Sequence, residues 1–300
     1  MPKSRKKKDQ DAIEYLEQNH INWFPGHMNK ALKEIKKNLK MVNIIIEVRD
    51  ARAPMASGNK GSYSHTGDKP YIIVFNKTNL AEPETVKKWE KWLTEQNESF
   101  IFLNALDKAG AKKLVDKAKK VLHDHRLKSN ANLELNKNQK IKMMILGLPN
   151  TGKSTLINKL ANRSATKAAA TPGQTRNQIW VKVGQEIELL DTPGVMPPRI
   201  PDQTHGLWLA AIHAIPDHIV SPEDSACFLI RHLIKKQSIG FKEQYKFDTS
   251  PKDLIEALDH IGKVRGCLQK GGLINYDQVY NLVLNDFRKG HLGPTSFESP

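Results

Sequence analysis

Short apolar runs alternate with amphipathic segments along the first two thirds of the chain. The runs with the length of buried strands cover residues 42–48, 71–75, 100–103 and 141–146. The segments whose apolar positions recur at helical spacing cover residues 29–40, 83–93, 108–125 and 153–160. Because strands alternate with helices, the pattern predicts an α/β fold with a mostly parallel sheet and helices on both faces.

The pattern changes twice farther along the chain. Residues 178–183 and 186–190 predict a hairpin around a turn at Gly184. Beyond about residue 199 no convincing strand is found, and helical spacing dominates, as in Leu254, Ile255, Leu258 and Ile261. The expected organisation is a basic tail over residues 1–20, an α/β domain over residues 21–204, and a small all-helical domain over residues 205–300.

The charge of the chain favours a polyanion as partner. Its 300 residues carry 47 Lys and Arg against 32 Asp and Glu, which gives a net charge of +15. Two clusters are suited to phosphate contacts that do not read sequence. They are Lys3, Arg5, Lys6, Lys7 and Lys8, and Lys108, Lys112, Lys113, Lys117, Lys119 and Lys120. Nucleic acid is favoured over a membrane, since no basic helix has a bulky apolar face.

Composition also bears on the cellular setting. The longest apolar runs, such as residues 41–48, are far too short to cross a membrane. No apolar signal peptide is apparent, and the only cysteines are Cys227 and Cys267. We therefore expect a soluble, cytoplasmic monomer without disulfides. A mitochondrial location is less favoured, because no Arg- and Ser-rich amphipathic presequence is recognisable.

Residues 147–154 match the phosphate-binding pattern G-x-x-x-x-G-K-[ST] between an expected strand and an expected helix. Backbone N–H groups of such a loop face a phosphate, and the helix N-terminus adds positive potential. We expect Lys153 to hold the β- and γ-phosphates and Ser154 to ligate Mg²⁺. The residues expected around the phosphates are Asn150, Thr151, Gly152, Lys153, Ser154 and Thr155.

A second segment fits the same site. Asp191 lies at the end of an expected strand and is placed to bind Mg²⁺, while the Gly194 N–H could meet a γ-phosphate. Between the loop and Asp191, Thr175 is our choice for a hydroxyl that closes on Mg²⁺ in the triphosphate state. Thr171 is the competing choice.

A third segment fits recognition of a guanine base. Asn76 and Lys77 follow an expected strand, where Asn76 bridges base and loop and the Lys77 stem covers a base face. Asn79 stands where a carboxylate would accept two guanine N–H groups, so we expect weaker guanine affinity and better tolerance of xanthine. Asn104 and Ala105 follow the next strand, where an N–H near Ala105 could read the guanine O6.

The order of these motifs is unusual, because the base-reading segment precedes the phosphate loop. Either the match at residues 76–79 is accidental or the domain is circularly permuted. The segments that complete the pattern are Trp23 to Met28, Val48 to Pro54, Arg265 to Leu268 and Gly271 to Asn275. In this order the motifs resemble the YlqF/RbgA family of circularly permuted, ribosome-assembly P-loop GTPases over roughly residues 20–298.

The resemblance implies a GTPase that binds the large ribosomal subunit late in its maturation, and hydrolysis stimulated by rRNA. No water-positioning Gln follows Gly194, so intrinsic hydrolysis should be slow. The resemblance points to His27 as the catalytic residue that orients water; the alternative is that His27 caps the adjacent helix. Several P-loop GTPases with Asn at the position of Asn150 bind K⁺ through it, which adds K⁺ as a second expected cofactor.

Two alternatives to a GTP-driven assembly factor remain open at this stage. One is an ordinary P-loop enzyme, such as a kinase or ATPase, or an NTPase of relaxed base specificity that acts on another RNA such as tRNA. Asn79 leaves this alternative open, whereas Asn76 and Asp191 argue against it. The other is a nucleotide-independent RNA-binding protein with a decayed site, which the intact Lys153, Ser154 and Asp191 disfavour.

Overall fold

The computed structural model of the chain describes residues 21, 23–59, 69–128, 140–161, 179–200 and 202–300. It contains two compact units. The sheet unit consists of residues 24–198 and 296–300, and the helical unit consists of residues 199–295 together with the described residues 21 and 23.

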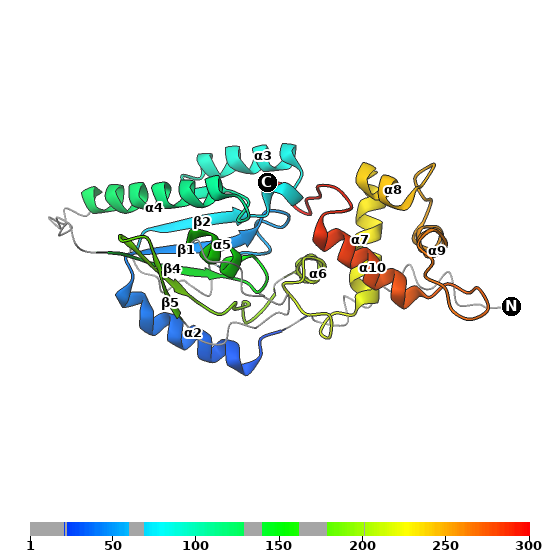
Figure 1. The fold of residues 1–300 in the computed structure, drawn as a ribbon, viewed down its shortest axis with the longest axis horizontal. Coiled ribbons are helices and arrows are strands. Elements are labelled where there is room, and N and C mark those ends of the chain that lie inside the picture. The colour runs from blue at the N-terminus through cyan, green and yellow to red at the C-terminus, as the bar shows by residue number, and fades with distance from the viewer. Residues whose placement is uncertain (1–20, 22, 60–68, 129–139, 162–178, 201) are drawn as a thin grey trace. The chain divides into compact units, whose positions relative to one another are not determined.

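The sheet unit is built on a six-stranded sheet in the order β3-β2-β1-β4-β6-β5 (Figure 1). The strands are β1 (Ile44–Asp50), β2 (Tyr71–Asn76), β3 (Phe100–Phe102), β4 (Ile141–Gly147), β5 (Ile179–Val183) and β6 (Ile187–Asp191). All neighbours pair in parallel except β5, which forms an antiparallel hairpin with β6. The expected α/β class and hairpin are therefore confirmed.

The strand order decides whether the inverted order of the motifs is accidental or results from circular permutation of the domain. β4, from the middle of the chain, lies at the centre of the sheet between β1 and β6. The strand that ends at Asn76 is only one strand farther away, and parallel strands place their carboxyl ends at one edge. The segments that come in inverted order along the chain thus meet at one edge of the sheet. The domain is circularly permuted.

Helices cover both faces of the sheet. They are α2 (Gly26–Asn38), the 3₁₀ turns η1 (Leu39–Met41) and η3 (Thr78–Leu80), α3 (Pro83–Glu95), α4 (Lys108–Lys128) and α5 (Lys153–Leu160). Alternate residues of a strand point to opposite faces. Val74 accordingly packs in a cluster with Leu114 of α4 and Leu156 of α5, whereas Phe75 packs in another cluster with Trp89 of α3.

The helical unit contains α6 (Gln203–Ala211), α7 (Pro222–Lys235), α8 (Ile239–Tyr245), α9 (Leu254–Val264) and α10 (Tyr276–Lys289). Each helix begins at a side chain that accepts a backbone N–H; these caps are Asp202, Ser221, Ser238, Asp253 and Asn275. The apolar faces of α7, α9 and α10 are buried, as the helical spacing predicts. An isolated bridge between Leu268 and Ile274 is the one β contact outside the named strands of the described chain.

The units end elsewhere than the sequence pattern suggests. The division falls between Pro198 and Arg199 rather than between residues 204 and 205, and residues 296–300 return to the sheet unit. Hydrophobic periodicity in the sequence does not indicate that residues 296–300 belong to the sheet unit, because their placement depends on a few hydrogen bonds. The tail at residues 1–20 and most of the connection at 128–139 lie outside the described residues. Among the helices described, none has both the length and the apolar character that a membrane span requires.

Candidate nucleotide-binding site

The phosphate-binding loop joins β4 to α5 and holds its own lysine in place. Thr151 Oγ1 donates to the Leu148 carbonyl at 3.0 Å, and Lys153 Nζ donates to the same carbonyl at 2.7 Å. Burial lowers the pKa of Lys153 to about 8, although the nearby Asp191 carboxylate opposes this shift. Ser154 and Thr155 follow in the first turn of α5, as predicted. The loop therefore presents a buried ammonium group at a helix N-terminus, an arrangement suited to phosphate.

Two glycines allow other segments to approach this loop closely. Gly152 has φ of 96°, and a Cβ there would overlap the amide of Asn76. A Cβ on Gly194 would lie 2.6 Å from the Pro149 backbone nitrogen. The base-side asparagine and the segment after Asp191 therefore both pack directly on the loop, and both contacts require the absence of a side chain.

Asn76 connects three segments that are distant in sequence. Its Nδ2 donates to the Thr151 carbonyl at 2.9 Å, and its Oδ1 accepts from the N–H groups of Lys77 and Ala105, each at 2.8 Å. The amide thereby joins the ends of β2 and β3 to the phosphate loop. The Ala105 N–H is already used in this contact with Asn76. That a backbone N–H near Ala105 reads the guanine O6 therefore stays a prediction. Asn104 Oδ1 accepts from the Leu106 N–H at 3.1 Å.

Lys77 lies at the same junction, in a left-handed conformation with φ of 63°. Its Nζ donates to the Asn150 carbonyl at 2.6 Å and pairs with Asp50 Oδ2 at 2.9 Å. Burial lowers the pKa of Lys77, and the Asp50 carboxylate opposes that shift. Asn79 is exposed within η3, beside this lysine in sequence.

Asp50 contacts the predicted base-side residue Lys77, although the motifs assign Asp50 no role of its own. It is fully buried at the end of β1, where Arg52 Nη2 donates to its Oδ2 at 2.8 Å. Against the effect of burial, the Arg52 and Lys77 cations hold the pKa of Asp50 far below its usual range. The signal in the sequence is the run of charges at Arg49, Asp50 and Arg52 directly after an apolar strand.

Asp191 ends β6 beside the phosphate loop. Its Oδ1 is buried and has no hydrogen-bond partner among the described residues. Burial also raises its pKa, with Lys153 opposing the shift. An orphaned buried carboxylate oxygen fits a divalent cation, which would supply the missing partner. No three acidic, His or Cys side chains gather as a ready metal site in the described part of the chain, so further ligands would have to come from elsewhere, such as Ser154 and phosphate.

His27 lies in the first turn of α2 with an exposed side chain. The helix is capped at Pro25 without a side-chain hydrogen bond, so the capping role considered for His27 is not found. The next residue, Met28, is buried, and its Sδ accepts from the Met196 N–H at 3.4 Å. This contact places the start of α2 against the segment that follows Gly194. The two switch candidates Thr171 and Thr175 lie outside the described residues.

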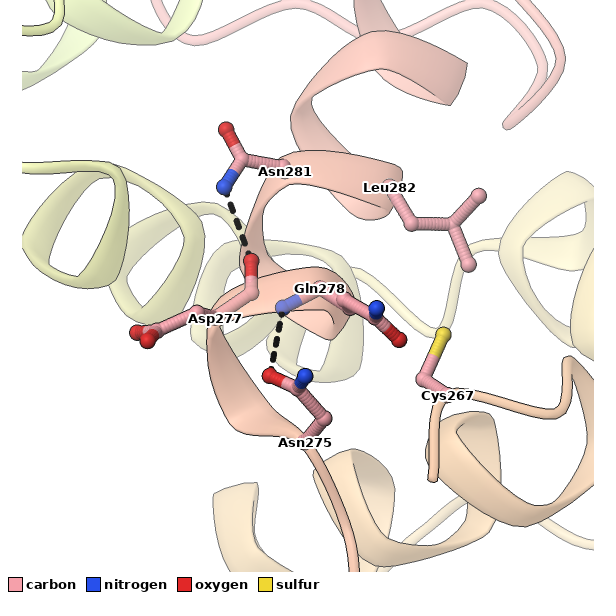
Figure 2. Close-up of a pocket in the computed structure, with 6 residues that line it drawn as sticks. All are labelled: Cys267, Asn275, Asp277, Gln278, Asn281 and Leu282. Atoms are coloured by element: carbon pink, nitrogen blue, oxygen red, sulfur yellow. Dashed lines mark hydrogen bonds between the residues drawn. The ribbon is translucent and has the colours of Figure 1, made fainter. Parts of the chain in front are cut away.

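The helical unit has a pocket of about 470 Å³ that contains none of the predicted site residues. Figure 2 shows Gln278 and Leu282 of α10 directed toward Cys267, while Asn275 and Asn281 bond to backbone groups of the same helix. Cys267 is buried, and burial raises the pKa of its thiol, which disfavours the nucleophilic thiolate. The pocket therefore offers no activated thiol.

Comparison with known proteins identifies the family. A family profile described as a 50S ribosome-binding GTPase matches residues 142–259. Ribosome biogenesis GTPase A of Bacillus pumilus is 39% identical over 282 residues, which cover 93% of this chain and 99% of that protein. The chain belongs to the ribosome biogenesis GTPase A family. The resemblance inferred from the motifs is thus confirmed.

Other members of the ribosome biogenesis GTPase A family agree with this assignment. The protein of that name from Bacillus cereus is 40% identical over 280 residues, covering 93% of this chain and 94% of its own length. The crystal structure of GNP-bound YlqF from T. maritima has a TM-score of 0.63 and 28% identity, and the match covers 90% of this chain and 98% of that one. As a member of the family, the chain is a GTPase that hydrolyses GTP to GDP and phosphate.

Lys153 predicts a pH dependence of nucleotide binding. With a pKa of about 8 in the ligand-free protein, most of its amine is neutral at pH 9. Phosphate favours the ammonium form, so binding at pH 9 must take up a proton, and GDP affinity should fall by up to about tenfold per pH unit above pH 8. Calorimetry in buffers of different ionisation enthalpy should find uptake of about one proton at pH 9 and much less at pH 7. Equal uptake at both values would contradict this assignment.

Proposed function

We propose that this GTPase is an assembly factor for the large ribosomal subunit, which it binds through rRNA in the GTP state and leaves upon hydrolysis. The observation that carries the proposal is the junction of the phosphate loop, Asn76 and Gly194 at one edge of a permuted sheet. Relatives over nearly the whole chain are named ribosome biogenesis GTPase A, which supports the ribosomal part. Neither a small-molecule kinase nor a decayed RNA-binding protein is favoured by that family.

The nucleotide roles follow the predicted motifs. Lys153 and the loop N–H groups hold the β- and γ-phosphates, while Asn76 and Lys77 lie on the base side. Ser154, Asp191 and Thr175 hold Mg²⁺, with Thr171 as the alternative to Thr175. When bound, Mg²⁺ supplies positive charge that offsets the charge on the transferring phosphoryl group. Gly194 reports the γ-phosphate. This role is supported by its packing on the loop and by the segment that follows it along the chain, which leads to the helical unit.

Hydrolysis depends on positioning water, and no glutamine follows Gly194 to do so. We assign this role to His27, which is exposed on the first turn of α2, next to a residue that contacts Met196. Its neutral imidazole can accept a hydrogen bond from the attacking water. Asn150 would hold K⁺, which would supply charge that an arginine otherwise provides.

One kinetic experiment tests both residues. In the presence of large ribosomal subunits and KCl, His27→Ala should lower the rate of GTP hydrolysis by about a hundredfold, the typical contribution of a positioned base. The control is Gln96→Ala at the exposed end of α3, away from the basic surface of α4, which should leave the rate unchanged. The unaltered protein should hydrolyse GTP more slowly in NaCl than in KCl. An unchanged rate in His27→Ala contradicts the catalytic role, and equal rates in the two salts contradict the K⁺ site.

Asn79 sets the expected base selectivity. A carboxylate at this position would accept both the N1–H and the 2-amino group of guanine, whereas an amide oxygen accepts one and the amide NH₂ repels the other. Xanthine carries a carbonyl in place of the 2-amino group, which suits the amide NH₂. The protein should therefore discriminate weakly between guanine and xanthine nucleotides.

The variant Asn79→Asp should bind GDP about tenfold more tightly and XDP more weakly, since a charge-assisted hydrogen bond contributes about 1.5–3 kcal/mol. Titration calorimetry with each nucleotide measures the ratio. Asn97→Asp serves as control, because it adds the same charge at an exposed position before β3, at the opposite edge of the sheet. If Asn79→Asp leaves the GDP to XDP ratio unchanged, Asn79 does not contact the base.

The basic surface supports rRNA as the ribosomal contact. Lysines occupy the exposed side of α4, whose opposite side packs on the sheet through Leu114 and Ala118. Lys119 pairs with Glu186, and the net charge of +15 shows that the chain carries more cations than carboxylates, as phosphate contacts require. We infer a cytoplasmic monomer that meets a single ribosomal site.

Sedimentation with purified ribosomal subunits tests the central proposal. The protein should co-sediment with the large subunit in the presence of a non-hydrolysable GTP analogue, and much less with GDP or with the small subunit. Higher salt should weaken this association, because phosphate contacts release counterions. A protein that stays off the large subunit in every nucleotide state overturns the assembly role, and nucleotide-independent binding favours the decayed-site alternative.

A further inference from the structure

Residues 296–298 form a short segment that leaves the helical unit and binds to the sheet unit. Ser296 Oγ accepts from the Glu82 N–H at 3.1 Å, at the start of α3. The Phe297 N–H donates to the Arg52 carbonyl at 2.8 Å, and the Phe297 side chain is only 8% exposed. The segment is therefore held at its first two residues by backbone groups of two different elements.

Glu298 makes the strongest of these contacts. Its Oε2 accepts from the Met55 N–H at 2.8 Å, and its Oε1 accepts from the Ala56 N–H at 2.7 Å. Trp89 Nε1 of α3 donates to the Glu298 carbonyl at 3.3 Å. A carboxylate that accepts two backbone N–H groups forms charge-assisted bonds, which exceed neutral ones in strength. Glu298 thereby fixes the turn over residues 51–57.

The turn over residues 51–57 leads directly to the base side of the nucleotide site. Arg52, whose carbonyl receives Phe297, donates through Nε and Nη2 to Asp50 at 2.9 and 2.8 Å. Asp50 in turn pairs with Lys77 Nζ at 2.9 Å, and Lys77 reaches the Asn150 carbonyl of the phosphate loop. These hydrogen bonds, together with the covalent chain between residues 52 and 56, thus connect Glu298 to the lysine assigned to the base.

We propose that Glu298 is a positioning residue for nucleotide binding. It holds the turn that carries Arg52, Arg52 orients Asp50, and Asp50 sets the Lys77 stem where it covers the guanine face. This inference rests on the base-side role of Lys77 given under the proposed function. Glu298 lies outside the phosphate, switch and base motifs. It connects residues 296–298 to the nucleotide site.

A double-mutant cycle on the full chain tests the connection. Glu298→Ala should lower GDP affinity by about three- to tenfold, and the same substitution should have no effect in a Lys77→Ala background. Glu95→Ala at the exposed end of α3 is the matched control and should leave GDP affinity unchanged. Calorimetric affinities are measured at a temperature at which thermal melts show every variant folded. Should Glu298→Ala fail to fold, Glu298→Gln keeps one carbonyl acceptor and should show a smaller loss of the same kind.

Each outcome has a separate meaning. Unchanged GDP affinity in Glu298→Ala, with only a lower melting temperature, overturns the proposal and leaves a purely structural contact. An equal loss of affinity in the presence and absence of Lys77 also overturns it, because Glu298 would then act by another route. If the unaltered protein itself does not bind GDP, the failure lies with the proposed function rather than with Glu298.

Discussion

The amide of Asn76 is the interaction on which the nucleotide site depends. One side chain donates to the phosphate loop and accepts from the ends of two strands, so three segments separated in sequence share a single hydrogen-bonding group. The approach is possible only because Gly152 has no Cβ. A buried amide satisfied on both its nitrogen and its oxygen fixes geometry more firmly than packing alone, since each lost bond would leave a desolvated polar group.

Permutation places the two sides of the site in inverted order along the chain. The base-side strands precede the phosphate loop, and the two sides are joined by β1 within the sheet and by bonds across the sheet edge. Asn76 and Lys77 supply two of them, and Asp50 supports the second from β1. The segment after Gly194 approaches the same loop from β6 and continues toward the helical unit.

The strands, the helices and the phosphate loop could be predicted because their signals are local. The strands and helices show hydrophobic periodicity, and the loop has a fixed motif spacing directly after a strand. Other features could not be predicted in this way. β1 continues to Asp50, beyond the end expected at Val48. The charged side chains at the end of this strand are buried and form ion pairs, such as that of Asp50 with Arg52. The pattern of polar and apolar residues cannot show which charges are paired. The contacts of residues 296–298 involve a few hydrogen bonds and the buried aromatic side chain of Phe297, and no repeat in the sequence indicates them. Asp191 ends β6 and Lys153 begins α5, at the element boundaries that the motifs indicate, and their nucleotide roles stay predictions. Their burial and pKa shifts depend on the three-dimensional surroundings, which the motifs do not describe.

The return of residues 296–298 makes the helical unit an insertion within the GTPase domain. The chain passes between the units after Trp23, Pro198 and Thr295, so residues 199–295 are joined to residues of the sheet unit at both of their ends. It follows that the two units are not separable by one cut: a fragment that stops at residue 198 would lack part of the GTPase domain itself.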